Sequence, residues 1–136
     1  MRVVMNKTHE TKKEKVTGAV VRPRIKLTLH TGERFFGPGI CELLEQIDSC
    51  GSILSASKEM GMSYTKAWKI LNRAEQEMNM HLIVRNNGGK NGGSSILTRE
   101  GREAIKCYRE MEKALERESE RLLENNYSVF RKREDD

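Results

Sequence analysis

The side chains with the clearest chemistry in this 136-residue chain are hydrogen-bonding and basic residues in two short segments. Hydroxyl, amide, ammonium and guanidinium groups can bond the edges of bases and phosphate oxygens, so both segments suit contact with duplex DNA. An acidic segment with Glu42, Glu45 and Asp48 stands apart, as expected if a polyanion is met in one orientation. The candidate DNA-contact residues are Ser63, Tyr64, Thr65, Lys66, Lys69 and Arg73 in the first segment, and Arg85, Asn86, Asn87, Lys90 and Asn91 in the second.

The net charge of +5 is distributed unevenly along the chain. Residues 1–26 hold eight basic and two acidic residues, residues 27–98 hold seven of each, and residues 99–136 hold ten basic and eleven acidic residues. The excess positive charge therefore lies in an N-terminal arm, which is compatible with a nucleic-acid partner.

Catalytic chemistry is not indicated by the remaining reactive residues. His9, His30 and His81 fall on the arm, on a strand and at a helix end, and no motif puts a nucleophile beside any of them. The glycine-rich segment 88–93 does not fit a nucleotide-binding loop, because Lys90 is followed by asparagine instead of serine or threonine. The sequence therefore predicts a protein that is not an enzyme and needs no cofactor.

Cysteine usage and hydropathy indicate a cytoplasmic protein. Cys41, Cys50 and Cys107 are odd in number and form no CxxC pair, which predicts buried reduced thiols instead of a metal site or a disulfide framework. No apolar run approaches the ~20 residues that cross a bilayer, and residues 1–15 lack the apolar region of a secretory signal. We therefore expect neither a membrane partner nor a bound metal.

Apolar periodicity predicts the first elements of the scaffold. Residues 24–31 alternate between apolar and polar, which is typical of a half-buried strand, and residues 31–33 suit a turn. Pro38 suits the first turn of a helix that ends at Gly51. The core face of this helix is Ile40, Leu43, Leu44 and Ile47.

A helix-turn-helix is predicted next. Ser52 can cap a short helix that ends at Gly61, and Ser63 can cap a longer helix directly after the turn. The core face of the longer helix is Ala67, Leu71 and Ala74, so its basic residues lie mostly outward. Trp68 could contact the DNA backbone, but an aromatic residue at this spacing usually packs in the core, so we assign it there.

A hairpin and a long helix follow. A strand at 82–84, a Gly/Asn-rich loop at 85–95 and a returning strand at 96–97 predict a wing. Thr98 can cap a helix that runs to about residue 125. The first two turns of this helix are expected to pack on their own domain. Beyond them, a partner helix is the natural cover for the apolar row. Glu118 interrupts that row. The predicted dimer interface is Ala104, Tyr108, Met111, Leu115 and Leu122.

The predicted fold is therefore mainly α with a small β-wing, a winged helix-turn-helix with a long C-terminal dimerisation helix. Its predicted parts are a flexible basic arm over residues 1–22, a DNA-binding domain over 23–98, the dimerisation helix over 99–125 and a tail over 126–136. A homodimer would set two recognition helices in successive major grooves about 34 Å apart, so the expected partner is double-stranded DNA with an inverted repeat.

Residues 51–78 resemble the helix-turn-helix of LysR-type regulators, and residues 24–125 resemble more closely the N-terminal domain of ModE-type molybdenum-dependent transcriptional regulators. The resemblance implies a winged-helix dimer that binds operator DNA through this domain, with the last helix in the dimer interface. Molybdate binds such regulators in C-terminal domains, which we expect this chain to lack, so no molybdate ligand is predicted and the effector stays unknown. The motifs that carry the resemblance are residues 43–47 (LLEQI), 63–68 (SYTKAW), 88–93 (GGKNGG) and 97–101 (LTREG).

Two alternatives to a self-sufficient DNA-binding regulator stay open. A winged helix can bind a protein instead of DNA, and the chain can also be the DNA-binding subunit of a regulator whose sensor is a separate protein. Outward basic residues on the longer helix favour DNA over a protein partner, because a protein-binding face would present apolar residues there.

Overall fold

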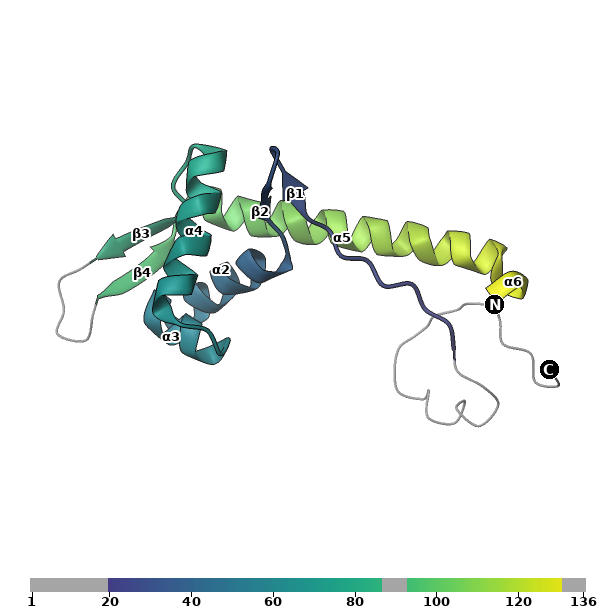
Figure 1. The fold of residues 1–136 in the computed structure, drawn as a ribbon, viewed down its shortest axis with the longest axis horizontal. Helices are drawn as coiled ribbons and strands as arrows, with labels where there is room; N and C mark the ends of the chain where they lie inside the picture. Colours follow the sequence, from purple (N-terminus) through teal and green to yellow (C-terminus); the bar gives the residue numbers. More distant parts are fainter. Residues whose placement is uncertain (1–19, 87–92, 131–136) are drawn as a thin grey trace. The chain divides into compact units, whose positions relative to one another are not determined.

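The computed structural model describes residues 20–86 and 93–130, and its fold is mainly helical, as predicted, with two small antiparallel strand pairs (Figure 1). The elements are β1 (Leu29–His30), β2 (Arg34–Phe36), α2 (Pro38–Cys50), α3 (Ile53–Glu59), α4 (Tyr64–Met78), β3 (Ile83–Asn86), β4 (Ser94–Leu97), α5 (Arg99–Asn125) and α6 (Tyr127–Phe130). One compact unit, residues 26–110, contains the hydrophobic core. The described part of a second unit is residues 20–25 and 111–130.

Helix α2 begins and ends at the predicted residues. Pro38 follows an extended Gly37 as the first helical residue, and Gly51, with φ +86°, ends the helix while its N–H donates to the carbonyl of Ile47. The predicted core face is confirmed, because Ile40, Leu43, Leu44 and Ile47 are all buried. On the polar side, Glu45 accepts hydrogen bonds of 2.8 and 3.0 Å from the Arg109 guanidinium, so the acidic segment is partly neutralised within its own domain.

Helices α3 and α4 form the predicted helix-turn-helix. The Ser52 hydroxyl accepts from the Ser55 N–H, and the Ser63 hydroxyl accepts from the Lys66 N–H, each at 3.0 Å, so both predicted N-caps are confirmed. Gly61 lies in the turn with φ +69°, a conformation that favours glycine. The core face of α4 is confirmed, since Ala67, Leu71 and Ala74 are fully buried.

The first strand is much shorter than predicted over residues 24–31. Only Leu29–His30 pairs, with Arg34–Phe36, across a turn in which Gly32 has φ +141°. The alternating pattern marks an apolar face, but the residues before Leu29 have no strand partner in the described part of the chain. Strand β2 was not predicted, because three residues are too few to show a period of two.

Strands β3 and β4 form the predicted hairpin directly after α4. Ile83 lies opposite Leu97 and Asn86 opposite Ser94. The prediction that the loop begins at Arg85 is wrong, because Arg85 and Asn86 belong to the paired part of β3. The pairing fixes the base of the wing, and with it the position of these two residues.

Helix α5 is capped by Thr98, as predicted. The Thr98 hydroxyl accepts from the Gly101 N–H at 2.9 Å and donates to the His81 carbonyl at 2.7 Å. The helix runs from Arg99 to Asn125. Residues 127–130 add the short helix α6, which the predicted tail did not include.

Candidate nucleic-acid interface

The first turns of α4 present most of the predicted recognition face to solvent. The exposed residues are Ser63, Tyr64, Thr65, Lys66 and Lys69. Their helix is anchored on its opposite face by the buried Ala67 and Leu71. The outward groups are therefore held by a rigid element, which suits recognition of a fixed partner surface.

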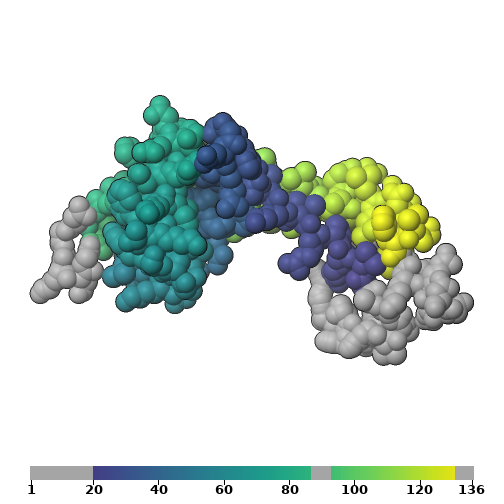
Figure 2. Space-filling model, in the orientation of Figure 1, coloured from purple at the N-terminus to yellow at the C-terminus, as the bar shows by residue number. Residues whose placement is uncertain are grey.

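Arg73 lies farther along α4 and is already paired. Its guanidinium donates to the Glu33 carboxylate at 2.5 Å, and Thr31 donates to Glu77 one turn farther along the helix. The surface of α4 (teal) thus lies beside that of the β1–β2 hairpin (dark blue), as Figure 2 shows. A phosphate would have to compete with Glu33 for Arg73, whereas Lys66 and Lys69 make no ion pair within residues 20–86 and 93–130.

Trp68 is not in the core, contrary to the prediction. Its side chain is 38% exposed, and the guanidinium carbon of Arg85 lies 5.3 Å from the centroid of its ring. Trp68 lies at the edge of the apolar stripe of α4, and the guanidinium of Arg85 from the wing lies over its ring. The structure thus joins two segments that the sequence analysis treated separately.

Glu75 is a functional candidate that the sequence analysis missed. It is buried, and its Oε2 accepts from the N–H groups of Leu82 and Ile83 at 2.8 and 3.3 Å, while Oε1 lies 3.6 Å from Nη2 of Arg85. The sequence does carry a signal for this role, because Glu75 follows Ala74 on the core face of α4. A carboxylate that is buried there must find hydrogen-bond donors within the protein.

The base of the wing borders a cavity of about 330 Å³. Its walls come from the start of α3, the start of α4 and both wing strands. Asn87, Lys90 and Asn91 lie outside the described residues, as do residues 1–19 of the predicted arm. The lining residues are Ser52, Ile53, Leu54, Tyr64, Arg85, Asn86, Gly93, Ser94 and Ser95.

The predicted dimer interface on α5 divides into two groups. Ala104 packs on its own domain, and Tyr108 is buried there, donating to the Leu27 carbonyl at 2.7 Å, with its ring centroid 5.3 Å from that of Phe36. Met111, Leu115 and Leu122 are 43%, 42% and 47% exposed. Only this second group is left available to a partner helix.

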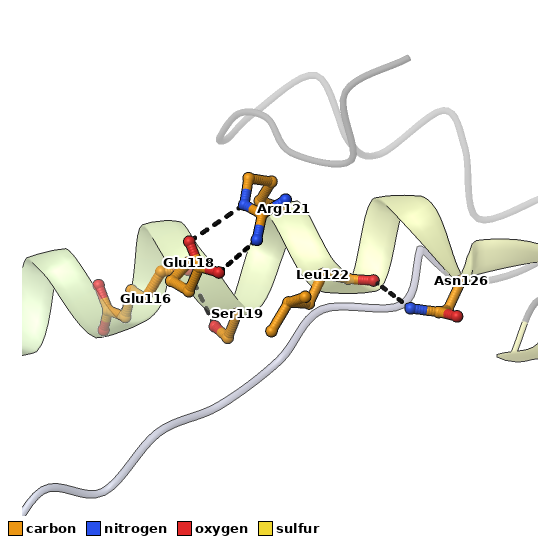
Figure 3. Close-up of polar contacts among 6 residues, drawn as sticks. All are labelled: Glu116, Glu118, Ser119, Arg121, Leu122 and Asn126. Carbon is orange, nitrogen blue, oxygen red and sulfur yellow. Dashed lines mark hydrogen bonds and ion pairs between the residues drawn. The ribbon is translucent and has the colours of Figure 1, made fainter.

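Glu118, which interrupts the exposed row, is paired along its own helix. Arg121 donates to both of its carboxylate oxygens, as Figure 3 shows. These hydrogen bonds from Arg121 lower the pKa of Glu118 below its ordinary value. The interruption is therefore a surface ion pair and not an isolated acid.

The remaining reactive residues in the described ranges do not gather into a second site. The prediction of buried thiols holds for Cys41 and is wrong for Cys50 and Cys107, which are exposed on helix surfaces. Within residues 20–86 and 93–130, no three histidine, cysteine or acidic side chains gather as metal ligands would. None of the described helices has the length and apolar character needed to span a membrane.

Comparison with known proteins finds similarity over the region of the helix-turn-helix. Residues 41–102 match the family described as bacterial regulatory helix-turn-helix protein, lysR family. The chain is 37% identical over 89 residues to the DNA-binding transcriptional dual regulator ModE of Escherichia coli K12, which is 65% of this chain and 34% of that protein. It is 41% identical over 86 residues to the molybdenum transport protein ModE of Azotobacter vinelandii, 60% of this chain and 32% of that protein. The chain thus matches about a third of the length of these relatives.

Proposed function

We propose, from the match of residues 41–102 to the lysR-family helix-turn-helix, that the protein is a dimeric transcriptional regulator that binds an inverted repeat in duplex DNA. Its relatives are named for transcriptional regulation and for molybdenum transport, so we extend the proposal to control of molybdenum-related genes. The protein would act in the cytoplasm and carry out no catalysis.

The observation that carries the DNA part is the outward face at the start of α4. Thr65, Lys66 and Lys69 are exposed there on a helix whose opposite face is fully buried. Recognition helices use such N-terminal residues to reach base edges in the major groove. An enzyme would instead need a convergent set of reactive groups, and a protein-binding face would need apolar residues at these positions.

The observation that supports a dimer is the exposed apolar row on α5. Met111, Leu115 and Leu122 recur at the four- and seven-residue spacings of a coiled-coil seam, and each is more than two-fifths exposed. A second copy of α5 would cover the row and place two recognition helices on one face of the duplex.

Selection from pooled random duplexes at two salt concentrations tests the proposed function. The expected result is enrichment of an inverted repeat whose half-site centres are about one helical turn apart, with affinity that falls steeply as salt rises. Binding without enrichment would favour the alternative in which this chain is the DNA-binding subunit of a regulator with a separate sensor. Absence of binding to every duplex would favour the protein-interaction alternative and overturn the proposal.

Replacing Lys66 or Lys69 by Ala is expected to weaken binding to the selected duplex by about 1–3 kcal/mol wherever the side chain reads a base. Titration of wild type and variants with the same labelled duplex measures the change. Lys106→Ala is the matched control, because Lys106 is an exposed lysine on α5. If both α4 variants bind as tightly as wild type, α4 is not the recognition helix.

A further inference from the structure

Arg85, at the base of the wing, is held between two residues of α4. Its guanidinium carbon lies 5.3 Å from the centroid of the Trp68 ring, and its Nη2 lies 3.6 Å from Oε1 of Glu75. Glu75 is itself fixed, because its other oxygen accepts from the N–H groups at the start of β3. A ring on one side and a fixed carboxylate on another leave the guanidinium little freedom to move.

Two of the three nitrogens of this guanidinium make no hydrogen bond within the described residues, although Nη2 lies within ion-pair distance of Glu75. Nε and Nη2 are shielded from solvent and donate to no acceptor in the part of the chain that the structure describes. Arginine carries five N–H donors, and a shielded donor without an acceptor costs free energy. These shielded nitrogens do not face solvent, but the Arg85 side chain as a whole is 27% exposed, so its exposed part can meet an anion while the rest is held in place.

The cavity beside Arg85 suits one class of anion. Ser52, Tyr64 and Ser94, which carry hydroxyl groups, line it, and none of the lining residues in the described part of the chain is acidic. Its walls belong to α3, α4 and both wing strands, the elements of a winged helix that lie nearest the duplex backbone when α4 enters the major groove. A phosphodiester brings negative oxygens that can accept from both the guanidinium and the hydroxyls.

We infer that Arg85 is a phosphate ligand for the DNA backbone at the junction of α3, α4 and the wing, and that Trp68 is the positioning residue that holds it there. The inference rests on the proposed function and adds a site to it. Only arginine combines a planar face that stacks on tryptophan with several donors for phosphate oxygens. A phosphate contact orients the protein without reading sequence, so this site contributes affinity to all duplexes alike.

Salt-dependent binding of Arg85→Gln tests the ligand. The variant is expected to bind selected and unrelated duplexes about tenfold more weakly, and its slope of log affinity against log salt should fall by about 0.9, the value for one phosphate. Arg85→Lys should keep the slope and lose affinity, because lysine retains the charge but not the stacked face. Lys106→Gln, which removes one exposed charge from α5, should change neither quantity measurably.

Double-mutant cycles test the positioning role of Trp68. Trp68→Leu is expected to weaken binding in the wild-type background and to have no further effect beside Arg85→Gln, whereas Trp68→Phe, which keeps an aromatic face, should restore most of the affinity. Trp68 is the single tryptophan of the chain, so its fluorescence should change on binding in wild type and much less in Arg85→Gln.

Two outcomes separate this inference from the proposed function. If wild type binds no duplex, the proposed function is overturned and the phosphate site with it. If wild type binds and Arg85→Gln binds with unchanged affinity and salt slope, only the phosphate site is overturned. An equal loss from Trp68→Leu in both backgrounds would show that Trp68 acts independently of Arg85 and overturn its positioning role.

Discussion

Leu115→Glu is expected to convert the protein to monomers and to weaken its binding to an inverted repeat by at least about a hundredfold, because linked half-sites gain about 10²–10⁴ from avidity. Leu115 lies in the middle of the exposed apolar row of α5, flanked by Met111 and Leu122. A glutamate there would be desolvated in a helix–helix seam, which is costly for a charged group. Light scattering measures the mass, and titration with the selected duplex measures the affinity.

Lys113→Glu is the control for this prediction. It introduces the same side chain into the same turn of α5, at a position that faces away from the apolar row in a heptad. It is expected to leave the mass of the assembly unchanged. A Leu115→Glu protein that remains dimeric would remove the α5 seam from the proposal, and a monomer that binds the repeat as tightly as wild type would show that dimerisation is not needed.

Gly101→Ala is expected to destabilise the fold by about 3 kcal/mol, near the upper end for overpacking of a core. A Cβ at this position would lie 2.2 Å from the carbonyl oxygen of Leu82. That oxygen cannot move away cheaply, because it accepts from the Thr98 N–H at 3.0 Å, and the Leu82 N–H is held by Glu75. Thermal and denaturant unfolding at one fixed protein concentration measure the loss, with a fall in Tm of roughly 10 °C or more.

Gly39→Ala gives the matched control. Gly39 also lies in the first turn of a helix, and a Cβ there would meet no atom within 4 Å. Alanine is a better helix former than glycine, so this variant is expected to be neutral or slightly stabilised. Equal stability of the two variants would mean that α5 does not approach the start of β3 as closely as the structure shows.

Most elements that position the candidate interface were predicted because their signals are local. A cap is made by residues within one helical turn, so Ser52, Ser63 and Thr98 could be assigned as caps from spacing alone. The same holds for Gly51 and Gly61, whose positive φ angles end a helix and make a turn. The outward placement of Lys66 and Lys69 follows directly from the periodicity of α4.

The errors concern residues whose surroundings come from distant parts of the chain. Trp68 lies at the edge of an apolar stripe, and whether such a residue is buried depends on what faces it, here Arg85 from the wing. Tyr108 continues the apolar row of α5, but its hydroxyl donates to Leu27, 81 residues away, so it belongs to its own core. Periodicity marks an apolar face and does not identify its partner.

The sequence by itself determined the helix-turn-helix, the wing, the long last helix and the outward basic face, since each depends on propensity, capping and periodicity over a few turns. Only the tertiary structure decided where the core of residues 26–110 ends on α5, and that Trp68 and Glu75 hold Arg85 beside a cavity. These outcomes depend on contacts between side chains far apart in the chain, and such contacts are set by how whole elements pack.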